Sequence, residues 1–170
     1  MMSTEPADAP PCWLDAAELE AWRGFSALLV SLSAELDSQM QRRADLSEFE
    51  YHVLAGLSEA PDRTMRISIL ADFAHGSLSR LSHLIKRLEQ RGWVRREQCP
   101  GDGRSTNAVL TDAGWAKVLE AAPHQVEVVR HLVIDALTPT QLRQLGEMST
   151  RMLARVERSD SACRRGDVGC

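Results

Sequence analysis

The chain lacks several features that would assign it to a common functional class. No stretch of its 170 residues approaches the eighteen consecutive apolar residues that a membrane-spanning helix needs. No nucleophile elbow, phosphate-binding loop, dinucleotide fingerprint or metal-ligand cluster is present, and the five histidines are scattered. These absences argue against a membrane protein, a metal or cofactor site, and an enzyme.

The cysteines are few and show no paired spacing of the kind that binds zinc. They lie at Cys12, Cys99, Cys163 and Cys170. We therefore expect a reducing cytoplasmic compartment and no structural disulfides. The composition, 44% apolar and 26% charged, is typical of an ordinary globular protein of one domain or a small two-part unit. Residues 1–14 and 158–170 contain no apolar pattern and are predicted to be disordered tails, with no signal peptide.

Helical spacing of apolar residues dominates the rest of the chain and predicts a mainly α fold. A capping box at Asp15 to Glu18 predicts a helix that continues to about residue 45, and a second at Ser47 predicts a helix through Leu57. Thr111 is expected to cap another helix, which Pro123 kinks or restarts. Thr138 to Gln141 has the residues of a further helix start.

The stretch from Ser77 to Leu110 combines one helix with a hairpin. Leucine and isoleucine recur at helical spacing on one face, at Leu78, Leu81, Leu84, Ile85 and Leu88. The hairpin is predicted from Trp93 to Gln98 and from Thr106 to Leu110, with a turn at Pro100 to Gly103. Upstream, Ser68 is expected to cap a short helix with Ile69, Leu70 and Phe73 inward, and Arg66 to Ile67 could pair with the hairpin. His75 and Gly76 form the intervening turn, so the stretch predicts a winged helix-turn-helix.

Positive charge is concentrated in this stretch. Residues 63–105 contain nine Lys or Arg against four Asp or Glu, whereas the rest of the chain contains eleven against twenty. A surface helix with a solvated hairpin is the simpler interpretation of the pattern. In an acidic protein of net charge −4, however, a segment of net charge +5 favours a polyanionic partner.

The same residues resemble the MarR family of bacterial transcription regulators. The run Asp102 to Ser105, followed by Val109 to Thr111 and Gly114, is similar to the family's wing. The region upstream is similar to the family's helix-turn-helix. The similar positions are Leu70 to Asp72, then Ser77, Ser79, Leu84 and Leu88, and then Gly92 to Arg96. The resemblance covers about residues 15 to 157 and is strongest from 46 to 114.

The three long apolar stripes outside the winged helix have no partner within that small core, which favours a homodimer. The resemblance likewise implies that N- and C-terminal helices dimerise. A two-fold dimer would place two recognition helices about 34 Å apart on a pseudo-palindromic site in double-stranded DNA. The expected domains are a dimerisation helix at 15–45, a DNA-binding lobe at 46–111 and dimerisation helices at 112–157.

Roles at the DNA face follow from residue type. Ser77, at the helix N-terminus, is expected to present backbone N–H groups to a phosphate. Arg80 is the preferred candidate for a guanine contact, and Lys86 and Arg87 are expected to contact phosphates. The other candidates for base edges are Ser79, Ser82 and His83.

The wing has two candidate residues. The resemblance implies that Arg104 enters the minor groove. Asp102 is expected to orient an arginine, with a simple turn residue as the alternative. Arg95 and Arg96 alternate on a strand, so at most one of them points at DNA.

The resemblance also implies a small aromatic or phenolic acid as effector. Residues that could line its pocket are Trp13, Trp22, Arg23, Phe25 and His52. Taken singly, Trp22 and Phe25 fit a core or interface better, and His52 fits a partly buried structural histidine. Cysteine-based oxidant sensing matches poorly, since Cys12 precedes the first helix and Tyr51 is the single tyrosine. Cys99 is interpreted as an idle thiol.

The leading hypothesis is a sequence-specific transcription regulator that works as a ligand-responsive homodimeric repressor. It would be cytoplasmic in a bacterium and associated with the nucleoid when bound to DNA. One alternative is a DNA-binding protein that responds to no ligand. Another is a protein-interaction module that uses the basic face of the winged helix.

Overall fold

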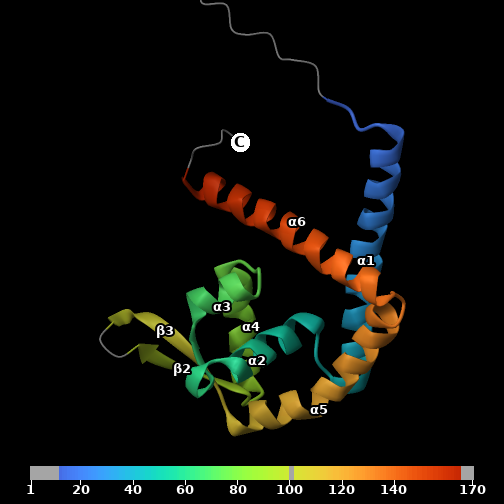
Figure 1. Ribbon diagram of the computed structural model, residues 1–170. Coiled ribbons are helices and arrows are strands. Elements are labelled where there is room, and N and C mark those ends of the chain that lie inside the picture. The colour runs from blue at the N-terminus through green and yellow to red at the C-terminus, as the bar shows by residue number, and fades with distance from the viewer. Residues whose placement is uncertain (1–11, 100–101, 166–170) are drawn as a thin grey trace, which may run out of the picture. The chain divides into compact units, whose positions relative to one another are not determined.

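The computed structural model describes residues 12–99 and 102–165, with the backbone alone described for 102–104 and 159–165 (Figure 1). The chain divides into two compact units between Glu35 and Leu36. Helix α1, Ala16–Ala44, begins in the first unit and ends in the second. Most of the predicted tail at 1–14 lies outside the described residues.

The start of α1 is the predicted capping box. The Glu18 amide donates to Asp15 Oδ1 and the Asp15 amide donates to Glu18 Oε2, both at 2.9 Å. In the first unit, the rings of Trp22 and Phe25 lie 6.4 Å apart in a tilted arrangement. Large apolar side chains of this unit are exposed, namely Trp22, Leu28, Leu29 and Val30. A solvated face of this kind is typical of a helix that packs against another chain.

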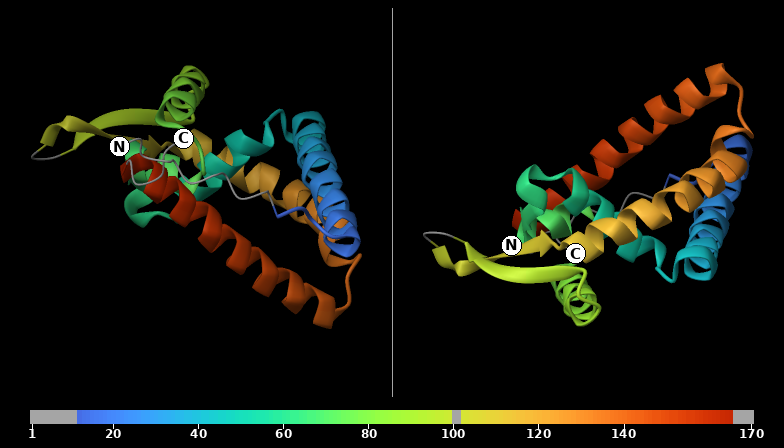
Figure 2. Two further views of the ribbon diagram at one scale, coloured as in Figure 1. Left: turned by 90° about the horizontal axis from the view of Figure 1, so that it is seen from above. Right: turned by 90° about the horizontal axis from the view of Figure 1, so that it is seen from below.

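The second unit contains the predicted winged helix. Its elements are α2, Glu48–Glu59; a 3₁₀ turn η1, Pro61–Arg63; β1, Thr64–Arg66; α3, Ile67–Phe73; α4, Leu78–Gln90; β2, Val94–Cys99; and β3, Asp102–Leu110. Strands β2 and β3 extend as a ribbon beyond these helices (Figure 2). The element order confirms the predicted fold class, mainly α with a small β hairpin.

The three strands form one antiparallel sheet in the order β1-β3-β2. Thr64 pairs with Val109 and Val94 pairs with Leu110, so β3 is central. The predicted strand at Arg66 and Ile67 therefore exists but begins two residues earlier and ends at Arg66. An irregularity in the register between Gln98 and Cys99 precedes the tip of the hairpin.

A single apolar core holds these elements together. Buried side chains of α2, α3, α4 and the sheet meet there, including Leu54, Leu70, Leu84, Ile85 and Leu110. The core also includes the end of α1, through Met40 and Ala44, and the first half of α5, Asp112–Val129, through Val118 and Ala121. The compact unit is thus larger than the 46–111 lobe predicted from the sequence.

The boundaries of α4 follow from local chemistry. The Ser77 hydroxyl accepts a hydrogen bond from the Arg80 amide at 3.2 Å, which caps the helix as predicted. His75, in the turn before it, has φ of 47°. At the other end Gly92 has φ of 74°, and the Trp93 amide bonds back to the Leu88 carbonyl at 3.0 Å. Glycine is suited to this left-handed position because it has no Cβ.

Three predictions about side-chain placement in this region are wrong. Ser68 does not cap α3, because the helix begins one residue before it, with Arg66 at the cap position. Ile69 is exposed rather than inward. Leu70 is buried as predicted, and Phe73 is 39% exposed but stacks its ring on His52 of α2. Leu78 is also exposed, by 57%, because it lies in the first turn of α4 before the buried stripe begins at Leu81.

The C-terminal helices are long. Pro123 lies inside α5 without ending it, and a π-helical turn η2, Arg130–Ile134, follows. Helix α6, Pro139–Arg165, starts where predicted, with the Gln141 amide donating to the Thr138 hydroxyl at 3.3 Å. It continues through 158–165, which corrects the tail predicted there, because the helical backbone does not stop at Arg158. In the described residues no helix is long and apolar enough to cross a membrane.

Candidate nucleic-acid interface

One face of α4 is buried and the other carries the predicted contact residues. Leu81, Leu84, Ile85 and Leu88 are almost fully buried. Every candidate on the opposite face is exposed: Ser77, Ser79, Arg80, Ser82, His83, Lys86 and Arg87. The helix therefore presents hydroxyls and cations to solvent, the groups that bind phosphates and base edges.

Arg80 lies against α2 rather than alone in solvent. Its guanidinium carbon is 4.2 Å from the centre of the Phe49 ring. A cation over a ring face is held by the ring quadrupole, and an arginine can keep this contact while its N–H groups stay available. This packing limits the positions from which Arg80 can reach a base.

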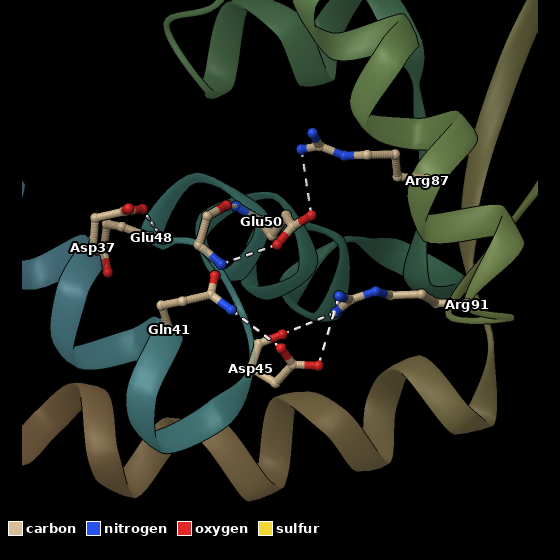
Figure 3. Close-up of polar contacts among 8 residues, drawn as sticks. Asp37, Gln41, Asp45, Glu48, Glu50, Arg87 and Arg91 are labelled. Carbon is tan, nitrogen blue, oxygen red and sulfur yellow. Dashed lines mark hydrogen bonds and ion pairs between the residues drawn. The ribbon is translucent and has the colours of Figure 1, made fainter.

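Lys86 and Arg87 are neighbours with different surroundings. Lys86 is exposed, and its side chain makes no hydrogen bond or ion pair with any residue that the structure describes. Arg87 Nη2 lies 3.3 Å from Glu50 Oε1, and Glu50 is buried (Figure 3). The two were predicted as equivalent phosphate contacts, and the structure distinguishes them.

A cavity of about 360 Å³ lies between α4 and the sheet. Its lining is mostly polar and cationic: Arg66, Ile67, Ser68, Leu78, Ser82, Arg96, Ser105 and Thr106. Arg96 is fixed there, since Nη2 donates to the Ser82 carbonyl at 3.1 Å and Nε lies 3.4 Å from Glu89 Oε2. Arg66 is exposed and was not predicted as a contact. The pairing of β1 with β3 was suggested by the sequence, but the place of Arg66 beside α4 depends on how the sheet packs against that helix.

The wing is formed by β2 and β3. Arg95 Nη2 pairs with Glu97 Oε1 at 2.7 Å on the same strand, so of the two wing arginines Arg96 is the one beside α4. Asp102 and Arg104 belong to β3, but their side chains lie outside the described part of the chain. Cys99 is buried, and its thiol donates to Asn107 Oδ1 at 3.0 Å.

The predicted effector residues fall in both units. Trp13, Trp22, Arg23 and Phe25 belong to the first unit, where Trp13 and Trp22 are exposed. His52 belongs to the second unit and stacks on Phe73, with ring centres 4.9 Å apart and planes 10° from parallel. His52 is exposed rather than partly buried, and its stacking on Phe73 supports a structural role for the ring.

A second cavity, of about 410 Å³, lies where α1 ends and α2 and α4 meet. Its lining is Asp37, Ser47, Phe49, Arg80, His83, Leu84 and Arg87. It places an aromatic ring beside two guanidinium groups. The sequence did not indicate this site, because Phe49 and Arg80 are thirty-one residues apart.

Helices α2 and α5 share a buried polar contact. Gln125 Nε2 donates to Glu48 Oε1 at 2.8 Å, while Glu48 Oε2 and Gln125 Oε1 are buried without a hydrogen-bond partner in the described residues. Burial raises the pKa of Glu48 above its usual range, which outweighs the lowering by Gln125. Burial also raises the pKa of Tyr51. These groups are interpreted as structural.

A helix-turn-helix with an exposed cationic second helix and an adjoining β hairpin defines the winged-helix class of proteins. A family model described as MarR family matches residues 46–106. Among solved structures, Sco3205, a MarR family transcriptional regulator from Streptomyces coelicolor in complex with DNA, is 44% identical with a TM-score of 0.82. The match covers 85% of this chain and 90% of that one. This chain therefore belongs to the MarR family.

Other relatives agree with this assignment. AbsC, a MarR family regulator from Streptomyces coelicolor, is 36% identical with a TM-score of 0.82, and the match covers 86% of this chain and 99% of that one. The transcriptional repressor MprA of Escherichia coli K12 is 24% identical over 123 residues, 72% of this chain and 69% of its own. The regulator PecS of Dickeya dadantii is 38% identical over 80 residues, 47% of this chain and 45% of its own.

Proposed function

We propose that this protein is a sequence-specific transcription repressor that binds double-stranded DNA as a homodimer on a pseudo-palindromic operator. The observation that carries the proposal is the exposed hydroxyl and cation face of α4, which lies beside a cationic cavity at the sheet. The 44% identical relative was solved in complex with DNA, which supports DNA as the partner. The family-wide role as transcriptional regulator supports a regulatory outcome over an enzymatic one.

In this proposal α4 is the recognition helix. Ser79, Arg80, Ser82 and His83 face base edges in the major groove, and Lys86 contacts a phosphate. Arg104, at the end of the wing, enters the minor groove, and Asp102 orients an arginine. Arg66 is added as a phosphate contact, because it is exposed and lines the cavity between α4 and the sheet.

The dimer would be formed by the helices at the ends of the chain. Apolar side chains of α1 and α6 are exposed, including Leu28, Leu29, Met152, Leu153 and Val156. Exposed apolar area of this extent is normally covered by a partner, and a two-fold axis would pair identical helices. The same axis would place the two copies of α4 on successive turns of DNA.

A small aromatic acid is the proposed effector class. The cavity at Phe49, Arg80 and Arg87 supports this, because its ring and two guanidinium groups suit an anionic aromatic molecule. Such a ligand would lower DNA affinity to the extent that it binds the DNA-free geometry better. If the protein binds no such effector, it is a ligand-independent DNA-binding protein whose activity depends on how much of it is expressed.

The first test is selection of bound sequences from random duplex DNA by the purified protein at physiological salt. We expect an enriched inverted repeat with half-sites about one helical turn apart. On that duplex, Arg80→Ala and Arg104→Ala should each weaken binding by about 1–3 kcal/mol, and Arg80→Ala should relax base preference at one position. A protein that binds no duplex, or binds every duplex equally, would contradict the proposal.

A further inference from the structure

The C-terminal end of α4 is joined to the corner where α1 ends and α2 begins by two arginine–carboxylate pairs (Figure 3). Arg87 Nη2 lies 3.3 Å from Glu50 Oε1. Arg91 Nη1 donates to the Asp45 carbonyl oxygen at 2.8 Å, and Arg91 Nη2 lies 3.6 Å from Asp45 Oδ2. We call these four residues the corner clamp. They lie within the second unit and join elements about forty residues apart in sequence.

The two carboxylates are held in place by their own helices. Glu50 Oε2 accepts the Ser47 amide at 2.9 Å, as the closing half of the capping box of α2. Asp45 has φ of 50°, and its Oδ1 accepts from Gln41 Nε2 at 3.1 Å. Acceptors that local structure has already oriented bind an arginine at little further entropic cost. The corner is therefore a rigid base for α4.

Burial makes one of these pairs costly to break. Glu50 is 7% exposed, and a buried carboxylate needs a compensating charge or hydrogen bond on each oxygen. Its two oxygens are used by the Ser47 amide and by Arg87. An Arg87 that turned away to a DNA phosphate would leave Glu50 Oε1 with no cation. This opposes the role predicted for Arg87 from its position on the exposed face.

Directional contacts add to the apolar stripe in setting the orientation of α4 about its own axis. Its apolar face packs through Leu81, Leu84, Ile85 and Leu88, and apolar contacts have little directional preference. Near its N-terminus the cation–ring contact of Arg80 with Phe49 restrains the helix, and near its C-terminus the corner clamp does so. Arg91 is further fixed over the Trp93 ring, 4.8 Å from its centre.

We propose that Arg87 and Arg91 are positioning residues, which set DNA affinity by holding α4 on the corner through Glu50 and Asp45 and do not contact DNA phosphates. The proposal rests on the proposed function of α4 as a recognition helix. It distinguishes Arg87 and Arg91 from Lys86, which has no partner in the described residues and is the phosphate contact of this half of the helix.

A double-mutant cycle separates positioning from direct contact. The variants are Arg91→Met, which keeps an apolar stem over Trp93, Asp45→Asn, which suits the left-handed backbone, and the two together. On the inverted repeat selected by the wild type, we expect each single change to weaken binding about tenfold and the double change to weaken it no further. Arg87→Met and Glu50→Gln form a second cycle with the same expectation.

Salt dependence supplies a readout that loss of stability alone would not change. Affinity is measured from low to high salt, well below the melting temperature of each variant. We expect the slope of log affinity against log salt to stay at the wild-type value in Arg87→Met and Arg91→Met. The matched control Lys86→Met should lose about one unit of slope. The positioning variants should also discriminate less against half-site spacings changed by one base pair.

Two results of the DNA-binding measurements would overturn the inference. One is a slope that falls by about one unit in Arg91→Met and Arg87→Met, which shows a phosphate contact. The other is that Arg91→Met weakens DNA binding by the same factor in the wild type and in Asp45→Asn. Additive effects of this kind would show that Arg91 does not act through Asp45.

Amide hydrogen exchange of the DNA-free protein tests, without any operator, whether the corner clamp restrains the end of α4. Asp45→Asn and Arg91→Met should raise exchange in the last turn of α4 equally, and Lys86→Met should leave it unchanged. If the wild type binds no duplex, the proposed function fails while this measurement still decides the clamp. Unchanged exchange in both clamp variants would then refute it.

Discussion

Gly114 is the residue at which α5 approaches the start of the wing most closely. A Cβ on Gly114 would overlap the Trp93 carbonyl oxygen, a backbone atom that cannot turn aside. The same carbonyl accepts the Thr111 amide at 3.0 Å, and the Thr111 hydroxyl donates to the Gly92 carbonyl at 2.7 Å. Thr111 and Gly114 are part of the sequence pattern that resembles the MarR wing, and this packing is the physical reason for them.

We predict that Gly114→Ala lowers the free energy of unfolding by about 2–4 kcal/mol, because the backbone must move to admit the methyl group. Urea denaturation measures it. The control is Gly24→Ala in α1, where a Cβ meets nothing within 4 Å, and this change should stabilise by up to about 1 kcal/mol. Equal stability of the two variants would show that the contact at Trp93 is relaxed in solution.

Residue type alone could not separate the cations of α4. Arg80, Lys86 and Arg87 lie on one exposed face, and the sequence correctly predicts that face. Which of them is already occupied depends on Phe49 and Glu50, which come from another helix. The side-chain environment of a surface arginine is a tertiary property, because its long side chain reaches elements far away in sequence.

At the scale of elements, helix boundaries were predicted well. Capping boxes at Asp15 and Ser47, the serine cap of α4 and the threonine caps at Thr111 and Thr138 all lie where expected. Each cap is a bond between residues three apart, so local sequence contains the whole interaction. Failures came where the sequence pattern was too short: α3 has only seven residues, and its cap and the inward position of Ile69 were predicted wrongly, while Leu70 is buried as predicted.

Ser77 and Ser79, at the start of the recognition helix, differ in whether the hydroxyl makes a local hydrogen bond. The Ser77 hydroxyl accepts from the Arg80 amide, whereas the Ser79 hydroxyl is exposed and makes no hydrogen bond in the described part of the chain. We predict that Ser77→Ala lowers the free energy of unfolding by about 1 kcal/mol, because the helix loses its cap. Ser79→Ala should change it by less than about 0.5 kcal/mol.

Thermal or urea unfolding of the two variants, with circular dichroism as the probe, makes the comparison. The proposed base contact predicts that Ser79→Ala still weakens operator binding even though it is as stable as the wild type. If Ser79→Ala destabilises as much as Ser77→Ala, the start of α4 in solution differs from the one described.

At the scale of the whole molecule, the exposed apolar faces of α1 and α6 predict a dimer. We expect the wild type to sediment as a dimer at micromolar concentration and Leu153→Glu to sediment as a monomer, since a charge in an apolar interface is strongly unfavourable. The control Gln144→Glu adds the same charge at an exposed polar position of α6 and should remain dimeric.

Operator binding is then measured for Leu153→Glu and for its control Gln144→Glu. The monomeric variant should bind one half-site weakly and lose its preference for an inverted repeat, because the second recognition helix is no longer tethered. A Leu153→Glu protein that remains dimeric would show that α6 is not part of the interface.

The sequence by itself determined the helices, the hairpin, the charged face of α4 and the family. These depend on periodicity, caps and turn residues, whose interactions span a few positions of the chain. The tertiary structure decided which exposed arginines are already engaged, Arg87 with Glu50 and Arg91 with Asp45, and it placed Arg66 beside the recognition helix. Such contacts join residues twelve to forty-six positions apart, and only the packing of one core brings them together.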